Sequence, residues 1–146
     1  MSDFRRRDFL QALAAIGFVA ATSAEAQTAG GGTLGKTRVF APEFKRQANG
    51  SDRWGVLDGT LATGEAVGMH VSVVPAGTPG ATPHKILHSE LLVVAEGTLE
   101  LWADGEVSRA PAGSVIYVAY GTNHAVRNVG DGPAKYFVWQ MGGDTK

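Results

Sequence analysis

Two stretches of the sequence decide the fold, PHKILHSELLVVAEG at residues 83–97 and GSVIYVAYGTNHAVRN at residues 113–128. Each one joins a run of apolar, often β-branched residues to a turn sequence that contains glycine, which is the pattern of successive β-strands. Three of the four histidines of the chain, His84, His88 and His124, lie within them, together with the strand carboxylate Glu90. Imidazole and carboxylate together are the ligand set of a divalent transition metal, so the sequence predicts one metal site inside a small β-barrel.

The chain around these stretches shows the same alternation of short strands and turns. Residues 66–74 alternate with period two and are rich in valine, as expected for a strand. Further strands are expected at intervals of about 8 to 12 residues, separated by turn sequences such as Asp104-Gly105 and Gly130-Asp131. No helical pattern follows residue 26. The predicted fold class is therefore all-β, a sandwich or a barrel.

The first 26 residues have the layout of a secretory signal peptide. A basic start, Arg5-Arg6-Arg7, precedes an apolar run at residues 12–21, and Ala24-Glu25-Ala26 supplies a small-residue cleavage site. The paired arginines resemble a twin-arginine signal, which exports folded bacterial proteins. The apolar run is shorter than the roughly 20 residues that span a bilayer. We therefore expect a periplasmic or secreted protein that has no membrane association once the signal is removed.

The sequence divides into three parts. Residues 1–26 are the expected signal peptide, residues 27–50 a flexible lead and N-terminal arm, and residues 51–146 a single β-barrel domain. Within the arm, Val39–Phe44 is either an edge strand or a segment that packs on a second subunit. We expect a homodimer that uses this arm and an outer sheet face.

The composition excludes several classes of function. The formal net charge is −1, which argues against nucleic acid as a partner. The chain contains no cysteine, so thiolate metal sites and cysteine nucleophiles are excluded. An exported domain without disulfides must be stabilised by its core, by an oligomer or by a bound metal.

The two stretches resemble the two motifs of a single-domain cupin, a jelly-roll-like barrel called the double-stranded β-helix. The first cupin motif reads Gly-x5-His-x-His-x3-Glu-x6-Gly, and the second reads Gly-x5-Pro-x-Gly-x2-His-x3-Asn. Residues in register with the first motif are His84, Glu90 and Gly97, with Gly77 displaced by one position. Residues in register with the second are Gly113, Gly121, His124 and Asn128, with Ala119 at the usual proline position.

This resemblance implies a site for Mn, Fe, Ni, Zn or Cu, which cupins hold with three histidines and the glutamate. The implied ligands are His84, Glu90 and His124, while Ile86 occupies the position of the remaining histidine and His88 is a displaced candidate. Six residues of straight strand span about 20 Å. His84 and Glu90 can therefore share one ion only if the chain bends between them.

Two other polar residues receive structural interpretations. We interpret His70 as facing solvent or an oligomer edge, because Gly68 and Ser72 share its face of the predicted strand. Asn128 is expected to fix the backbone of a turn or strand.

The sequence leaves two functions open. The first is a metal-dependent enzyme, an oxygenase, isomerase or lyase, that acts on a small molecule. The second is a non-catalytic cupin that binds a small ligand and has a degenerate metal site, marked by Ile86. The sequence identifies no catalytic residue, substrate or specific metal.

Overall fold

The computed structural model describes residues 31–48 and 50–143, and all regular structure in this part of the chain is β-strand. The strands are, in chain order, β1 (Gly32–Thr33), β2 (Glu43–Arg46), β3 (Asp52–Thr60), β4 (Ala66–Val74), β5 (His84–Lys85), β6 (Ser89–Glu96), β7 (Thr98–Ala103), β8 (Glu106–Pro111), β9 (Val115–Val118), β10 (Asn123–Asn128) and β11 (Ala134–Met141). The predicted all-β fold class is confirmed. The expected signal peptide, residues 1–26, lies outside the described residues.

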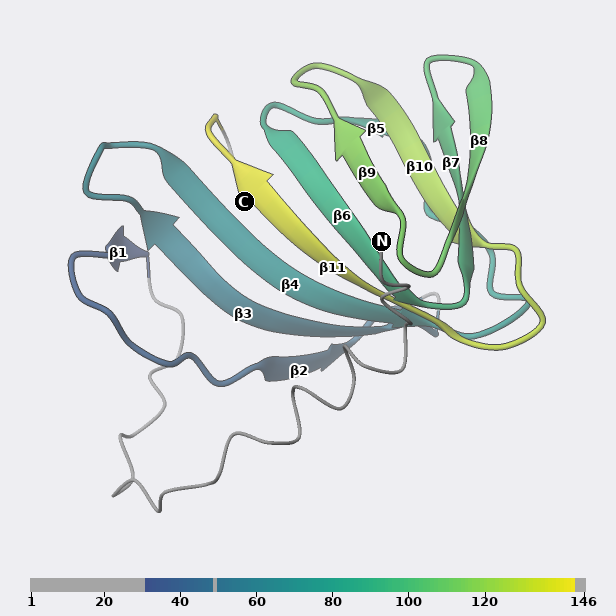
Figure 1. Ribbon diagram of the computed structural model, residues 1–146, viewed down its shortest axis with the longest axis horizontal. Helices are drawn as coiled ribbons and strands as arrows, with labels where there is room; N and C mark the ends of the chain where they lie inside the picture. The colour runs from purple at the N-terminus through teal and green to yellow at the C-terminus, as the bar shows by residue number, and fades with distance from the viewer. Residues whose placement is uncertain (1–30, 49, 144–146) are drawn as a thin grey trace, which may run out of the picture.

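The strands form two sheets that face each other (Figure 1). The large sheet has seven strands in the order β1-β3-β4-β11-β6-β9, and β2 also pairs with β3. The small sheet has four strands in the order β5-β10-β7-β8. In Figure 1 the small sheet lies beside β6 and β9, whereas β1, β2 and β3 lie at the opposite end of the large sheet.

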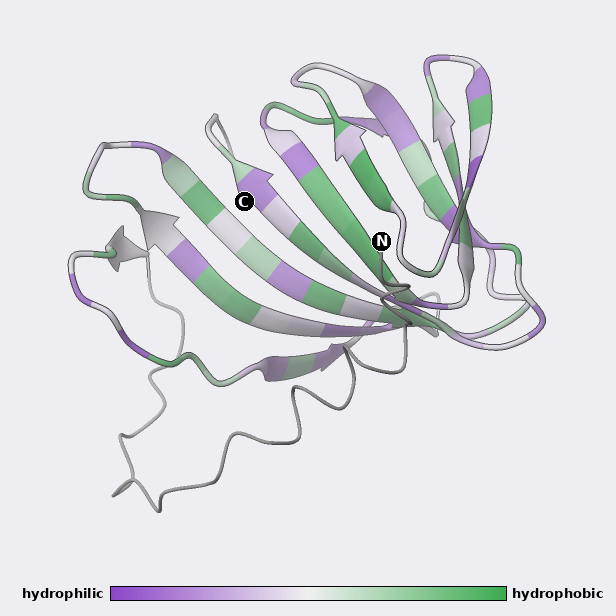
Figure 2. Ribbon diagram, in the orientation of Figure 1, coloured by the Kyte–Doolittle hydropathy of each residue, from purple (hydrophilic) through white to green (hydrophobic). Residues whose placement is uncertain are grey.

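The hydrophobic core fills the space between the small sheet and strands β11, β6 and β9 of the large one. Leu92 and Val94 on β6 and Leu99 on β7 are the largest of its fully buried members, with at most 2% of their surface exposed. Figure 2 shows the hydrophobic run along β6. Burial of each such side chain stabilises the fold by about 1.5–3 kcal/mol. No described residue of β3 belongs to this core, so the core does not cover the inner face of the large sheet at its β3 end.

Two turns require the backbone conformation that their sequences favour. Asp104 and Gly105 have φ angles of 47° and 93°, the conformation of a tight hairpin turn between β7 and β8. Gly97 has a φ of 76°, and a Cβ atom there would lie 2.7 Å from the carbonyl oxygen of Pro133. The glycine at the end of the first motif is therefore needed for the close approach of two chain segments.

The first motif passes from one sheet to the other. His84 lies on β5 of the small sheet and pairs with β10, whereas Glu90 lies on β6 of the large sheet. Between them the side chain of Ile86 is buried in the core and that of Leu87 is exposed. The crossing supplies the bend that His84 and Glu90 need in order to approach each other.

The described part of the N-terminal arm forms edge strands of the same molecule. β2 pairs with β3 in antiparallel fashion, and β1 pairs with the other end of β3 in parallel fashion. Phe44 on β2 packs against Trp54 on β3, with ring centroids 5.3 Å apart. Among the described residues there is no helix of the length and hydrophobicity needed to cross a membrane.

Candidate functional site

The four predicted ligands reach the interior from both sheets. His84 and His124 are directly opposite each other on β5 and β10, and their ring centroids are 4.9 Å apart. Glu90 projects from β6, and His88 immediately precedes that strand. His88, Glu90 and His124 are buried, with 6%, 6% and 3% of their surface exposed, whereas His84 is exposed.

Glu90 is held between two imidazoles. Nε2 of His88 lies 2.9 Å from Oε1 of Glu90, and Nε2 of His124 lies 3.3 Å from Oε2. Because the two rings contact different oxygens, the carboxylate lies between them. In agreement with this closed arrangement, no three or more His, Cys, Asp or Glu side chains of residues 31–48 and 50–143 form a group with metal-holding geometry.

Gln140 on β11 completes the polar cluster, and the sequence analysis did not identify it. Its Nε2 donates to Oε1 of Glu90 at 3.1 Å and also lies 3.1 Å from Nε2 of His88. In the sheet, Gln140 is the register partner of Glu90. The period-two pattern of β11 could have identified it, because Gln140 shares a face of the strand with the buried residues Tyr136 and Val138.

The cluster keeps Glu90 ionised at neutral pH. Burial by itself would raise the pKa of Glu90, but hydrogen bonds from His124, His88 and Gln140 and the charge of His124 outweigh burial. Together they lower the pKa from 4.5 to about 2. Glu90 is therefore a buried carboxylate that is bonded to His124 and His88.

Three features of the cluster fit a cation in chemical terms. Nε2 of His88 contacts both a carboxylate and an amide nitrogen, although one ring nitrogen can either donate or accept, not both. Nδ1 of His124 is buried and has no hydrogen-bond partner in the described chain. Nδ1 of His84 lies 3.3 Å from the carbonyl oxygen of Thr82, a contact in which it must donate, so Nε2 of that ring keeps its lone pair. The donor types thus suit a transition metal, although the side chains contact one another in this structure and, among the described residues, do not form a metal-holding group.

A cavity of about 350 Å³, which we call the site cavity, adjoins the cluster. Its polar lining residues are Gln47, Ser51, Arg53, His70, Ser72, His84, Glu90, His124, Tyr136 and Gln140. Apolar side chains of Leu92, Val126 and Val138 line it as well. His88 contacts Glu90 from outside this lining. A volume of this size suits a small molecule.

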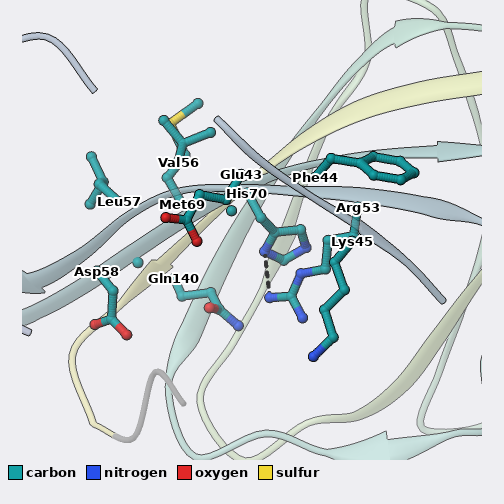
Figure 3. Close-up of a pocket in the computed structure, with 12 residues that line it drawn as sticks. Glu43, Phe44, Lys45, Arg53, Val56, Leu57, Asp58, Met69, His70 and Gln140 are labelled. Carbon is teal, nitrogen blue, oxygen red and sulfur yellow. Dashed lines mark hydrogen bonds between the residues drawn. The ribbon is translucent and has the colours of Figure 1, made fainter. Parts of the chain in front are cut away.

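A second hollow of about 360 Å³, which we call the β3 hollow, lies at the open end of the large sheet (Figure 3). It shares Arg53, His70 and Gln140 with the site cavity. Its other charged lining residues are Glu43, Lys45 and Asp58.

The prediction that His70 faces solvent or an oligomer edge is wrong. His70 lies on the inner face of β4, lines both hollows, and accepts a hydrogen bond at Nδ1 from Nη2 of Arg53 at 3.1 Å (Figure 3). Burial and the charge of Arg53 lower its pKa from 6.5 to about 4, against the opposing effect of Glu90. The opposite face of β4, which carries Val71 and Val73, is the outer face of the large sheet, beside Trp54 and Phe137.

Asn128 fixes the backbone, as expected. Its Nδ2 donates to the carbonyl oxygens of Val74 and Gly132 at 2.9 and 2.8 Å, and its Oδ1 accepts from the backbone nitrogen of Gly130 at 2.9 Å. Asn128 therefore ties β10 to the end of β4 and to the turn before β11.

Part of the chain matches a known protein family. Residues 69–140 match the family model described as the cupin domain. These residues are similar to a cupin domain, and the described chain has the cupin fold. The matched range includes all four predicted ligands, three in the first motif and one in the second.

Solved structures support the same cupin fold. An RmlC-like cupin with a double-stranded β-helix fold from Methanocaldococcus jannaschii is 20% identical, with a TM-score of 0.56, over 70% of this chain and 90% of that one. An RmlC-like cupin from Shewanella frigidimarina is 15% identical, with a TM-score of 0.54, over 71% and 86% of the two chains. A cupin superfamily protein from Desulfitobacterium hafniense is 14% identical, with a TM-score of 0.53, over 66% and 82%. Among curated proteins, none matches the chain.

Proposed function

We propose that this cupin binds one divalent transition metal through His84, His88, Glu90 and His124 and that it is a metal-dependent enzyme acting on a small molecule. The observation that supports the proposal most strongly is the buried carboxylate of Glu90, held between two imidazoles beside a cavity of about 350 Å³. Bound Mn, Fe, Ni, Zn or Cu would supply Lewis-acid chemistry or activate dioxygen or water, as oxygenase, isomerase or lyase reactions require.

The chain's own residues have distinct parts in this proposal. Glu90, with its pKa lowered to about 2, is an anionic ligand throughout the physiological pH range. Gln140 orients the carboxylate by donating to Oε1. His84 stands at the exposed side of the cluster, where its ring faces both the site cavity and His124.

A second candidate function is a non-catalytic cupin that binds a small ligand. The closed hydrogen-bond network around Glu90 favours it, because the network satisfies the carboxylate without a metal. The burial of Ile86 in the core favours it too, since no imidazole is present at that motif position.

Metal analysis of purified protein tests the first proposal. We expect about one metal per chain in the wild type and a large loss in Glu90→Gln and His124→Ala, because each removes a ligand. Glu96→Gln is the matched control, since Glu96 is an exposed carboxylate on the same strand. Substoichiometric metal in the wild type that is unchanged in both site variants would rule out the metal site.

Thermal unfolding with and without a chelator separates the two functions. A metal present at about 100 times its Kd stabilises the fold by about 2.7 kcal/mol, so its removal lowers the Tm visibly. The non-catalytic alternative requires an unchanged Tm.

We also propose export to the periplasm or the exterior, on the basis of the signal-like residues 1–26. N-terminal sequencing of the mature protein is expected to begin at Gln27. A chain that keeps its first residues would contradict export by this signal.

We further propose a homodimer formed by the outer face of the large sheet. That face carries Leu91, Val93, Val115 and Tyr117, and the last two are each 62% exposed. A contiguous apolar sheet face of this kind is more typical of an interface between subunits than of a surface in contact with water.

A further inference from the structure

Among the residues that the structure describes, Arg53 stands apart from the candidate metal ligands and has no anionic partner. It lies on β3 opposite Ser72 of β4, and its side chain lines both the site cavity and the β3 hollow. Within residues 31–48 and 50–143, its recorded polar contact is with the imidazole of His70, and no carboxylate lies within ion-pair distance of it.

The contact with His70 orients the guanidinium without neutralising it. Because a guanidinium only donates, Nδ1 of His70 must accept, so the ring is neutral and carries its proton on Nε2. A guanidinium has five N–H donors, and this contact occupies one nitrogen only. Arg53 therefore keeps both its full charge and spare donors at the wall of the cavity.

Of the charged residues that line the site cavity, Arg53 is the one without a partner of opposite charge among the described residues. Glu90 and Arg53 are its two lining residues of fixed charge, and Glu90 is already satisfied by His88, His124 and Gln140. The acidic side chains of Glu43 and Asp58 line the β3 hollow but not the site cavity. In Figure 3 these two acids lie on one side of His70, while Arg53 and Lys45 lie on the other.

We propose that Arg53, oriented by His70, binds a carboxylate group of the small molecule that occupies the site cavity, so that the substrates or ligands of this protein are small carboxylic acids. The planar fork of a guanidinium matches a carboxylate with two parallel hydrogen bonds. A monoanion fits better than a phosphate dianion, because the ionised Glu90 shares the cavity. This inference rests on the proposed use of the cavity as the substrate site, but not on a bound metal.

Matched acid and amide probes test this inference. Binding of 4-fluorobenzoate and 4-fluorobenzamide, with acetate and pyruvate as further acids, is followed by ¹⁹F NMR or calorimetry on the full mature chain. We expect at least one acid to bind, 4-fluorobenzoate about tenfold more tightly than its amide, and Arg53→Gln to weaken acid binding about tenfold. His70→Ala is expected to weaken it less, and Arg53→Lys to restore part of it. Arg109→Gln, which removes an exposed arginine on β8, is the control.

Repeating the titration after chelation, and with Glu90→Gln, separates this inference from the metal proposal. If the metal proposal fails, Arg53 still distinguishes the acid from the amide in metal-free protein. If metal binds as proposed but acid and amide bind equally, or Arg53→Gln has no effect, the carboxylate subsite is overturned. Absence of saturable binding of every acid at millimolar concentration also overturns it.

Discussion

Oε2 of Glu90, in the large sheet, lies 3.3 Å from Nε2 of His124, in the small sheet, so a polar contact joins the two sheets through the interior of the barrel. Leu92, a core residue, and Val126, which packs against the core, line the same cavity as this contact. The candidate site is therefore part of what holds the two sheets together, and its titration must affect stability.

Stability is expected to fall in acid as Glu90 becomes protonated. Its pKa is about 2 in the folded protein, below the 4.5 of an ordinary glutamate, so the unfolded chain binds the proton more readily. The stabilisation is thus complete above about pH 4.5 and is lost as the pH falls towards 2, with a total of about 3 kcal/mol. Urea unfolding across this range measures it. Glu90→Gln should remove this component, and Glu96→Gln should retain it.

The histidine at the inner face of β4 is expected to titrate in an unusual range. His70 has a folded pKa of about 4 against an ordinary 6.5, so the neutral form stabilises the fold above pH 6.5 and this contribution disappears as the pH falls through 4. NMR of the imidazole carbons should reveal one histidine that titrates near pH 4 and is missing from His70→Gln. An ordinary titration of His70 would contradict its burial beside Arg53.

Replacing Ile86 by the histidine usual in the cupin motif is not expected to repair the metal site. Ile86 is 3% exposed and packs in the hydrophobic core, not along the site cavity. Burial of an unpaired imidazole there should destabilise the fold by about 2–4 kcal/mol. Ile86→Val, the size control, should cost about 1 kcal/mol. Chemical unfolding and metal titration of Ile86→His check both parts, and a gain in metal affinity would show that this side chain turns towards the site.

Loss of the Asn128 amide is expected to loosen three backbone segments at once. Asn128→Ala leaves the carbonyl oxygens of Val74 and Gly132 and the nitrogen of Gly130 without this partner, at a cost of about 2–4 kcal/mol. Asn128→Asp keeps only the contact to Gly130, so its stability should lie between those of Asn128→Ala and the wild type. Equilibrium unfolding in urea measures both variants, and equal stability of Asn128→Ala and wild type would contradict the structural role.

Lysine substitution on the outer sheet face is expected to dissociate the proposed homodimer. Val115→Lys combined with Tyr117→Lys places two charges on this face, and sedimentation should then give the mass of one chain. Val107→Lys is the matched control, because Val107 is 59% exposed on β8 of the other sheet. A dimer that survives the double substitution must use another surface.

The sequence was sufficient to predict the fold, because the evidence for it is local. Period-two patterns, glycine turns and the spacing of two motifs are all properties of short segments, and the hairpin at Asp104-Gly105 formed where its residues indicated. The proximity of His84 to His124 was implied by the resemblance to the cupin motifs.

What the sequence analysis missed depends on which face of each strand turns inward. Both faces of β4 carry apolar residues, so periodicity alone does not identify His70 as interior; the pairing of β4 with β3 and β11 does. Gln140 and Arg53 lie outside both motifs, on strands whose partners are distant in sequence. Ile86, His88 and Glu90 are all buried, but the chain crosses from β5 to β6 among them, so only the structure shows that Ile86 packs in the core and His88 against Glu90.

The crossover between β5 and β6 places a core side chain, Ile86, only two positions from an imidazole of the polar cluster, His88. A change in the volume of that core side chain would shift the backbone that carries the imidazole, since both belong to one short connection. Evolution or engineering of this protein cannot therefore tune hydrophobic packing and the chemistry of the cavity independently, and useful variants at either position will need a compensating change at the other.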